Sequence, residues 1–269
     1  MESGRAVRKR KEACLGKLVL ERGGYVCHAV LGQGAFSVVY CVERKSDAKT
    51  YACKVSENIP FLEKEADILA KLSHRLFPVF LLFWTEAGLG FLLTEWVPGT
   101  NMEKMLGRRG NFSAAATLRA GRGLAEGLSY LHKRPERFLF RDVKPANVIV
   151  CQDGRVRLVD LGCVCSMREK VTSRAGTPGF AAPEQFHDHV SLTASCDVYG
   201  LGQTLKVMLG NREESGGSGK NTMGRRGAGD PGQKRRRRKL EGLLEDCTKE
   251  NVSQRISDMD EVRRRFALM

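Results

Sequence analysis

The chain has 269 residues, 42% hydrophobic and 28% charged, which is enough to bury the core of one large domain or of two lobes. No apolar run approaches the roughly 18 residues of a membrane-spanning helix. The basic N-terminus also lacks the continuous apolar region of a signal peptide. Nine cysteines, an odd number without CxxC spacing, indicate reduced thiols and a soluble, cytoplasmic protein.

The net charge of +14 is concentrated in two runs, residues 5–11 and 234–239, whereas the central part of the chain is closer to balance. Nucleic acid, an anionic membrane surface or an acidic partner can each bind such a run. The second run, "KRRRRK", has no interleaved aromatic residues for base stacking and directly precedes an apolar helical pattern. The solvated end of a linker is therefore its simplest interpretation, and contact with an acidic partner stays open.

Strand-like runs and turns alternate in the first third of the chain. Three such runs fill residues 25–56, separated by "GQG" and by the polar turn "RKSDAKT". Two more are predicted over residues 79–85 and 90–96, across the turn "EAGLG". Before them, "PFLEKEADILAKLSH" (residues 60–74) predicts a helix, since proline suits a first turn and apolar residues recur at helical spacing as far as Leu72.

Helical patterns dominate after "VPGTN". Ser113 is a suitable N-cap for a helix over "AAATLRAGRGLAEGLSYLHK", and "DVYGLGQTLKVML" predicts a largely buried helix. Residues 211–233 are rich in Gly, Ser, Arg and Asn, which predicts a flexible segment before an amphipathic helical pattern resumes over residues 240–268. We therefore expect a small β-rich lobe, a hinge near residues 95–99 and a larger helical lobe.

Two features of the β-rich part suit a phosphate-bearing ligand. Gly32 and Gly34 lie in the turn of "LGQGAFSVVY", where the backbone can approach an anion, although a plain hairpin turn explains them equally well. Lys54 of "YACK" follows one strand later and can point inward at phosphates or outward to solvent. A buried lysine needs a carboxylate, and the predicted helix offers Glu65 on its packed side, with Glu63 in reserve.

The stretch "FLFRDVKPANVIV" places charged and amide side chains between apolar flanks, which is costly unless they are paired or do chemistry. Phosphoryl transfer needs a base for the hydroxyl, positive charge on the migrating group and metal ions on the phosphates. Asp142 can accept the proton and Lys144 can meet the γ-phosphate. Asn147 and Asp160, the latter in "LVDLG", are hard oxygen donors suited to Mg²⁺ or Mn²⁺.

The ordered motifs "GQGAFSVV", "YACK", "FRDVKPAN", "DLG", "AAPE" and "DVYGLG" resemble the eukaryotic-like Ser/Thr protein kinase family. The resemblance covers residues 25–209 and resumes at "LEDCTKENVSQR". It implies an α+β, bilobal protein-kinase fold over residues 25–269 behind a basic N-terminal extension, 1–24. The N-lobe would span about residues 25–95 and the C-lobe about 100–269, with ATP between them. The compact size and "DLG" are similar to bacterial members.

The resemblance also implies a set of nucleotide contacts. Lys54, paired with Glu65, would hold the phosphates. Thr94 would be the gatekeeper beside the adenine ring, although the apolar positions are indistinguishable from ordinary core residues. The implied contacts of the nucleotide, besides Lys54, are Gly32, Gln33, Gly34, Ala35, Val39, Ala52, Thr94, Glu95, Val97 and Ile149.

Further roles follow from the same resemblance. Glu184 of "AAPE" would pair with Arg255, and Asp197 would hold the backbone of the catalytic loop. Phe140 stands where the family usually has His, and Leu161 replaces the Phe of Asp-Phe-Gly; both keep an apolar spine. Residues 211–233 lie where the family often has a docking helix, so docking of protein substrates departs from the family pattern.

Substrate and regulation are implied by the same loop. Lys144 followed by proline is typical of Ser/Thr-directed members, and Thr177 in "GTPGFAAPE" would contact the catalytic acid and Lys144. Arg141 implies control by phosphorylation of the segment after "DLG", and Thr172 and Ser173 are the candidates for autophosphorylation, or are ordinary loop hydroxyls.

The sequence therefore predicts an ATP- and Mg²⁺-dependent Ser/Thr protein kinase. A small-molecule kinase of the same fold is one alternative, against which "AAPE" and Thr177 speak. The other is an ATP-binding scaffold without turnover, which loss of a catalytic residue would have favoured. Cys163 and Cys165 form a CxC pair that can sense oxidation or hold a metal, but space-filling thiols are the simpler interpretation.

Overall fold

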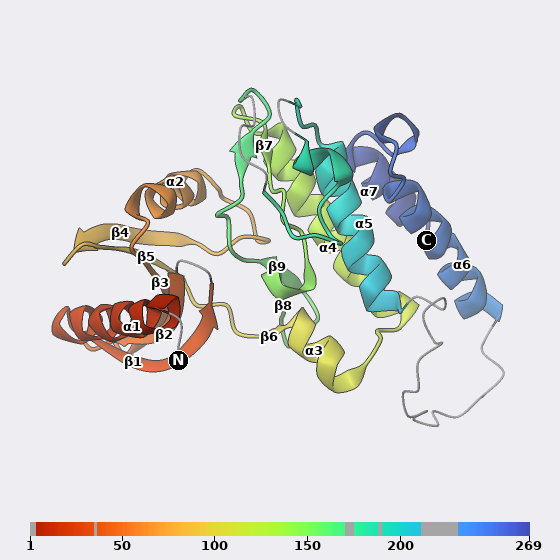
Figure 1. Ribbon diagram of the computed structural model, residues 1–269. Coiled ribbons are helices and arrows are strands. Elements are labelled where there is room, and N and C mark those ends of the chain that lie inside the picture. Colours follow the sequence, from red (N-terminus) through yellow and green to blue (C-terminus); the bar gives the residue numbers. More distant parts are fainter. Residues whose placement is uncertain (1–3, 35–36, 170–174, 188–189, 211–230) are drawn as a thin grey trace. The chain divides into compact units, whose positions relative to one another are not determined.

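A computed structural model describes the fold. The described residues are 4–34, 37–169, 175–187, 190–210 and 231–269, with residues 4–12 described by their backbone alone. The chain divides into two compact units, Met1–Pro98 and Gly99–Met269. Figure 1 shows that a sheet and two helices make up the first unit and that helices dominate the second.

One five-stranded antiparallel sheet forms the base of the first unit, with the strand order β1-β2-β3-β5-β4. The elements of this unit are α1 (Gly4–Arg22), β1 (Tyr25–Gln33), β2 (Ser37–Arg44), β3 (Lys49–Ser56), α2 (Ile59–Ala70), β4 (Phe80–Glu86) and β5 (Leu89–Glu95). In β2, buried Val38, Tyr40 and Val42 alternate with more exposed residues, so one face of the strand packs on a core. The three strands predicted within residues 25–56 are confirmed.

The hairpin of β4 and β5 turns at Ala87 and Gly88. Both residues have positive φ values, 52° and 77°, which suit a tight two-residue hairpin turn. The predicted strands, 79–85 and 90–96, differ from the observed ones by one residue at each end, because the turn is shorter than the polar pattern suggested.

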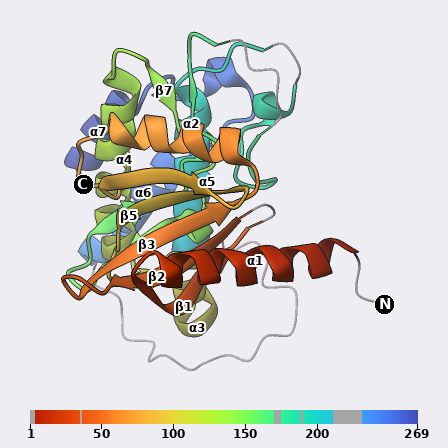
Figure 2. The same cartoon turned by 90° about the vertical axis from the view of Figure 1, so that its left-hand side faces the viewer.

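The basic N-terminal extension contains α1, a helix that the sequence analysis did not predict. Val19 and Leu20 belong to the buried cluster on one face of the sheet, and Tyr40 Oη donates a hydrogen bond to the Ala13 carbonyl over 2.7 Å. Figure 2 shows α1 running beside the first strands. The sequence signal for this helix is weak, because Gly16 lies in the buried stripe beside Val19 and Leu20, while Leu15 and Leu18 are exposed.

The helix α2 packs on the opposite face of the sheet. Leu62 and Ala66 contact Leu92 of β5, and the Asn58 side chain caps the first turn by accepting a hydrogen bond from Phe61 N over 3.3 Å. The helix ends at residue 70, four residues before the predicted end, because the chain tightens into a turn there.

Helices α4 and α5 form the centre of the second unit. Its elements are β6 (Thr100–Asn101), α3 (Met102–Arg109), α4 (Ala114–Lys133), β7 (Phe138–Leu139), η1 (Pro145–Asn147), β8 (Val148–Val150), β9 (Val156–Leu158), β10 (Cys165–Ser166), η2 (Pro183–Phe186), α5 (Ser195–Leu209), α6 (Pro231–Cys247), η4 (Val252–Gln254) and α7 (Met259–Ala267). As predicted, Ser113 caps α4 by accepting a hydrogen bond from Ala116 N over 3.2 Å. Gly121 of α4 permits close packing, since a Cβ there would lie 2.8 Å from both Leu205 and Phe266.

Two short sheets, β6-β8-β9 and β10-β7, lie beside the helices of this unit. The helical pattern predicted over residues 240–268 is divided between α6 and α7. The run 234–239 is part of α6, so its interpretation as the end of a linker is wrong. The helix begins at Pro231, inside the segment 211–233 that was predicted to be flexible. Residues 211–230 of that segment lie outside the described part of the chain. Within the described residues, no helix is both long and apolar enough to cross a membrane.

Candidate active site

The first unit pairs Lys54 with Glu65. Lys54 lies on β3 and Glu65 on the apolar side of α2, and the distance from Nζ to Oε2 is 2.6 Å. Glu65 is 3% exposed, whereas Glu63, the reserve candidate, is exposed on the other side of the helix. A buried carboxylate beside an ammonium is stable only as a pair, so each side chain fixes the position of the other.

The glycine turn begins at the level of Lys54 in the register of the sheet. The strand register places Gly32 opposite Val39, and Val39 opposite Lys54. Gly34 N donates to the Ser37 carbonyl over 2.8 Å and closes the turn. A Cβ built on Gly32 would meet no atom within 4 Å, so the backbone there is open to a ligand. Ala35, which was also expected at this site, lies outside the described residues.

The other nucleotide candidates of this unit follow on β3, β5 and beyond. Ala52 is opposite Thr94, whose Oγ1 donates to the Ala52 carbonyl over 3.4 Å, so both share the face that carries Lys54. Glu95 N donates to the Val79 carbonyl over 2.9 Å, and Val97, two residues on, is half-buried. Ala52 and Thr94 thus lie on the face that carries Lys54, and Glu95 and Val97 follow Thr94 along the chain.

Ile149 was predicted at the same site but belongs to the second unit. It lies on β8 opposite Asn101 and Arg157, and its Cγ2 is 2.6 Å from where a Cβ on Gly99 would be. Glycine is therefore required at position 99 by the close approach of β8.

Three predicted residues of the second unit form a hydrogen-bonded triangle. Thr177 Oγ1 donates to Asp142 Oδ1 over 2.7 Å, and Lys144 Nζ donates to Thr177 Oγ1 over 2.6 Å. Lys144 Nζ also lies 2.8 Å from Asp142 Oδ2. Asp142 is 8% exposed, so these contacts balance a charge that is largely removed from water.

Asn147 extends this triangle. Its Nδ2 donates to the Asp142 carbonyl over 2.9 Å and to Asp142 Oδ2 over 3.1 Å. The amide nitrogen is thus occupied, and Oδ1 is the atom of Asn147 suited to a cation. Asp160 follows β9 with a φ of 70°, is exposed, and accepts a hydrogen bond from Gly162 N over 3.3 Å. An amide oxygen and an exposed carboxylate fit the oxygen ligands of Mg²⁺ or Mn²⁺.

Asp197 of α5 holds the backbone that leads to Asp142. It is fully buried and accepts hydrogen bonds from Phe140 N over 2.8 Å and Arg141 N over 2.7 Å. His132 Nε2 of α4 lies 2.8 Å from Asp197 Oδ2. Phe140 and Leu161, the two departures from the family motifs, are both buried. Both positions thus carry buried apolar side chains.

Several contacts that support the loop around Asp142 were missed from the sequence. Gln185 Nε2 donates to the carbonyls of Arg141 and Ala175, over 2.8 and 2.9 Å. Thr204 Oγ1 donates to the Val143 carbonyl over 2.9 Å, and Asn101 Nδ2 donates to the Ala146 carbonyl. These contacts join residues far apart in the chain, so no local pattern could reveal them.

Arg255 connects α6 and α7 to the segment before α5. Its guanidinium contacts both carboxylate oxygens of Glu184, at 2.6 and 3.1 Å, and donates to the Ser195 carbonyl over 3.2 Å. It also lies 4.8 Å from the centre of the Tyr199 ring. Arg255 is 4% exposed, so this expected pair is a buried structural contact.

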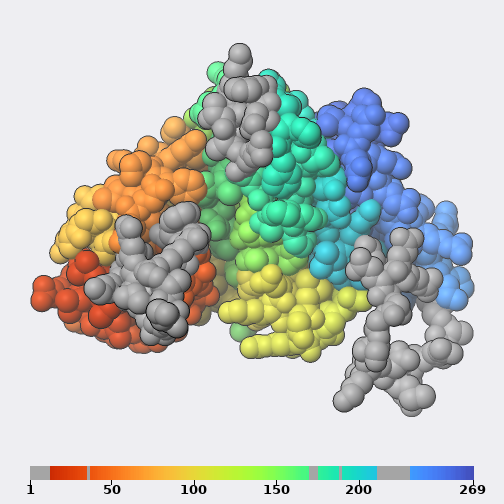
Figure 3. Space-filling view, viewed as in Figure 1, coloured from red at the N-terminus to blue at the C-terminus, as the bar shows by residue number. Residues whose placement is uncertain are grey.

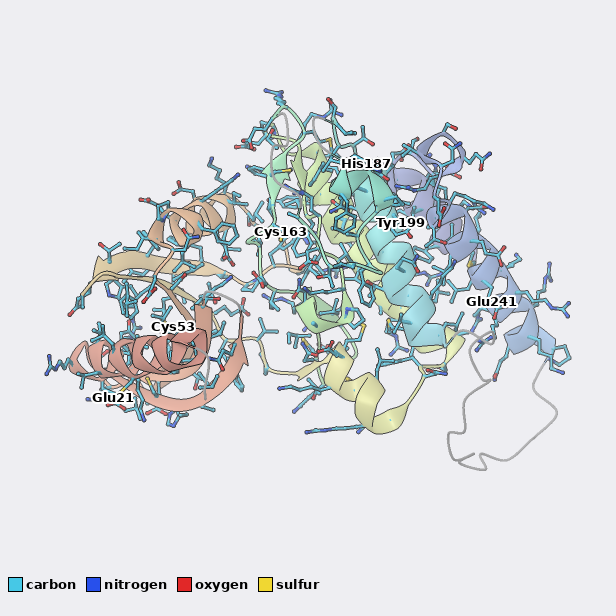
Figure 4. The ribbon with its side chains drawn as sticks, in the orientation of Figure 1. Glu21, Cys53, Cys163, His187, Tyr199 and Glu241 are labelled. Atoms are coloured by element: carbon cyan, nitrogen blue, oxygen red, sulfur yellow. The ribbon has the colours of Figure 1, made fainter. Side chains whose placement is uncertain are left out.

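Of the two cysteines that follow Asp160, Cys165 is buried and Cys163 is partly buried. Burial, together with the nearby carboxylates of Asp142 and Asp160, raises the pKa of the Cys163 thiol to about 11, and burial raises the pKa of Cys165. Both thiols are therefore protonated at neutral pH and suit a space-filling role. Figure 4 shows Cys163 among the side chains of this unit. Arg141 is buried, whereas Thr172 and Ser173 lie outside the described residues.

Comparison with known proteins is consistent with this geometry. Residues 25–266 match the family model described as protein kinase domain. Human cAMP-dependent protein kinase catalytic subunit PRKX is 30% identical over 58% of this chain and 45% of its own length. Rat rhodopsin kinase GRK1 is 34% identical over 68% of this chain and 35% of its own length. Hamster (Mesocricetus auratus) beta-adrenergic receptor kinase 1 is 29% identical over 71% of this chain and 29% of its own length. The chain thus spans less than half the length of each of these relatives.

Proposed function

This chain belongs to the protein kinase family, with its bilobal α+β fold, and we propose that it transfers the γ-phosphoryl group of ATP to serine and threonine hydroxyls of proteins. The observation that carries the proposal is the triangle of Asp142, Lys144 and Thr177. It combines a carboxylate that can accept a proton, a cation that can meet developing negative charge, and a hydroxyl that orients both.

Asp142 acts on the acceptor hydroxyl. Each carboxylate oxygen has two lone-pair sites, so Asp142 can accept the substrate hydroxyl while it retains Thr177 and Lys144. The proton moves to Asp142 as the hydroxyl oxygen bonds to the γ-phosphorus, and the bond from that phosphorus to the bridging oxygen of ADP breaks. Lys144 Nζ offsets the negative charge of the migrating phosphoryl group.

The resemblance to protein kinases implies which residues contact the nucleotide. Lys54, oriented by Glu65, contacts the phosphates, and the backbone of residues 32–35 covers them. Val39, Ala52 and Ile149 contact the adenine ring beside Thr94. The backbones of Glu95 and Val97 bind the edge of the ring. Support comes from the shared face of Val39, Ala52, Lys54 and Thr94.

Asn147 and Asp160 hold Mg²⁺ or Mn²⁺. When bound, the cation neutralises phosphate charge and aligns the γ-phosphate. The arrangement of Asn147, whose nitrogen is turned toward Asp142, supports this role because it leaves the oxygen for the metal.

Regulation and location are part of the proposal. Arg141 binds a phosphate that autophosphorylation places on Thr172 or Ser173, and this contact orders the segment around Thr177.

Residues 25–269 form the kinase domain. The protein acts in the cytoplasm, and residues 234–239 contact an acidic partner.

The test is transfer of labelled phosphate from ATP with Mg²⁺ to a protein mixture, to small alcohols and to the chain itself, with modified residues identified by mass spectrometry. Phosphoserine and phosphothreonine on proteins, absent with Asp142→Asn, are the expected products. Label confined to small molecules would establish the small-molecule kinase instead. ATP binding without any transfer would establish the scaffold.

A further inference from the structure

The helix α6 begins with consecutive cations. All residues from 234 to 239 are Lys or Arg, and all except Arg237 are exposed. The first turn contains no acidic residue. Like charges three and four residues apart repel each other on a helix, and the N-terminal end of a helix already carries positive partial charge. The run therefore costs stability, which is difficult to explain as a purely structural feature.

Arg237 fixes this part of α6 to α5. Its Nε donates to Glu241 Oε1 over 2.8 Å, and its Nη2 donates to the carbonyls of Leu209 and Gly210, each over 3.3 Å. The C-terminal end of α5 thus anchors the helix through one arginine and leaves the other cations of the run at the surface.

The end of α3 meets α5 at the same place. Phe112 N donates to the Met208 carbonyl over 2.7 Å, and the Asn111 side chain lies against Gly210. The last turn of α3 carries Arg108 and Arg109, both exposed. Figure 3 shows atoms of α3, α5 and α6 on one face of the second unit. Cations from two helices are therefore anchored at the end of α5.

These cations form what we call the basic surface. Its members are Arg108, Arg109, Lys234, Arg235, Arg236, Arg238 and Lys239. Within the described part of the chain, none of these side chains makes an ion pair or a side-chain hydrogen bond. Exposed arginine and lysine side chains of this kind can bind an anion.

We propose that the basic surface docks an acidic segment of protein substrates, at a distance from the residue that is phosphorylated. This rests on the proposed function, which requires the second unit to bind polypeptide. Arginine binds carboxylates through two parallel hydrogen bonds, and most members of the surface are arginines. The stretch 231–239, "PGQKRRRRK", has no large apolar residue to enter a membrane and no aromatic ring to stack on bases.

The binding test uses a fluorescein-labelled peptide of alternating Glu and Ser, followed by anisotropy at two salt concentrations. Replacing Arg235, Arg236, Arg238 and Lys239 by Gln is expected to weaken binding about tenfold or more, and added salt is expected to weaken the wild type. The matched control replaces four exposed cations outside the basic surface by Gln. These are Lys49, Lys71, Arg119 and Lys249. This control is expected to retain its affinity for the peptide. Equal affinity of wild type and α6 variant would overturn the proposal. The proposal would also be overturned if the wild type bound RNA duplex or phosphatidylserine vesicles but not the acidic peptide, and if the α6 variant lost that binding.

The kinetic test uses two peptides with the same phosphoacceptor, one of which carries the Glu-Ser segment through Gly-Ser linkers of three lengths. For the best linker, we expect KM to be lower than for the plain peptide, and the α6 variant to lose this difference with kcat unchanged. The same KM for both peptides in the wild type would contradict docking of substrates. If neither peptide is phosphorylated, the proposed function fails, while anisotropy still decides whether the surface binds acidic segments.

Discussion

At the scale of single residues, the site depends on few polar contacts in buried surroundings. Asp142 accepts hydrogen bonds from Thr177 and Asn147 and lies beside Lys144. In such surroundings a hydrogen bond to a charged group contributes about 1.5–3 kcal/mol. We therefore expect loss of one contact to be measurable in the rate of phosphate transfer.

Thr177 tests this directly. Thr177→Val keeps the shape of the side chain but removes the hydroxyl between Asp142 and Lys144, so kcat should fall about tenfold to a hundredfold. Thr177→Ser keeps the hydroxyl and should retain most of the activity. Steady-state phosphate transfer measures both, and equal kcat for the valine variant and the wild type would remove Thr177 from the mechanism.

Variants of Lys54 and Glu65 distinguish the contribution of this pair to stability from its contribution to activity. Lys54→Met leaves a buried carboxylate without its ammonium and should lower the free energy of unfolding by about 3 kcal/mol. Adding Glu65→Leu should restore most of that stability, because the remaining buried charge is removed. Urea unfolding measures the recovery. Phosphate transfer should stay low in both variants, and its return in the double variant would show that Lys54 is not needed for chemistry.

At the scale of elements, α1 is held by its buried stripe. Leu20 is fully buried, whereas Leu18 of the same helix is 43% exposed. Leu20→Ala should therefore lower the free energy of unfolding by about 2–4 kcal/mol, and Leu18→Ala should change it by less than about 1 kcal/mol. Chemical denaturation compares the two. Equal, small effects would show that α1 does not contribute to the core of the first unit.

The contact between α4 and α7 should depend on pH. Hydrogen bonds from Lys133 and Ser129, and then from Arg263, hold the pKa of Asp260 well below its usual range. A carboxylate with a lowered folded-state pKa stabilises the protein above its unfolded pKa, near about 4, and this contribution is lost as the pH falls. Since Asp260 is about one-third exposed, we expect about 0.5–1 kcal/mol.

Asp260→Asn measures that contribution. The variant should be less stable than the wild type at pH 7, and the difference should shrink below about pH 4 as the wild-type carboxylate is protonated. A difference that stays constant between pH 7 and pH 2 would mean that the charge of Asp260 is irrelevant to the contact.

At the scale of the molecule, the sequence predicted what local chemistry determines. The β-rich run between the glycine turn and the polar turn predicted β2, and the hydroxyl of Ser113 predicted the start of α4. Glu65 was the preferred partner of Lys54, with Glu63 in reserve, because Glu65 lay on the packed side of the predicted helix, and the structure shows the pair of Lys54 and Glu65. Contacts such as Gln185 with Arg141 could not be predicted, since they depend on tertiary distances. The helix α1 was missed because its large apolar residues are divided between the buried stripe, with Leu20, and the exposed side, with Leu15 and Leu18.

The most direct measurement of the central claim compares wild type and Asp142→Asn in ATP binding and in single-turnover phosphate transfer. If Asp142 is the base, the affinity for ATP with Mg²⁺ should be unchanged while the transfer rate falls about 10²- to 10⁴-fold. A variant that transfers phosphate at the wild-type rate would contradict the account, because no proton acceptor at position 142 would then be needed.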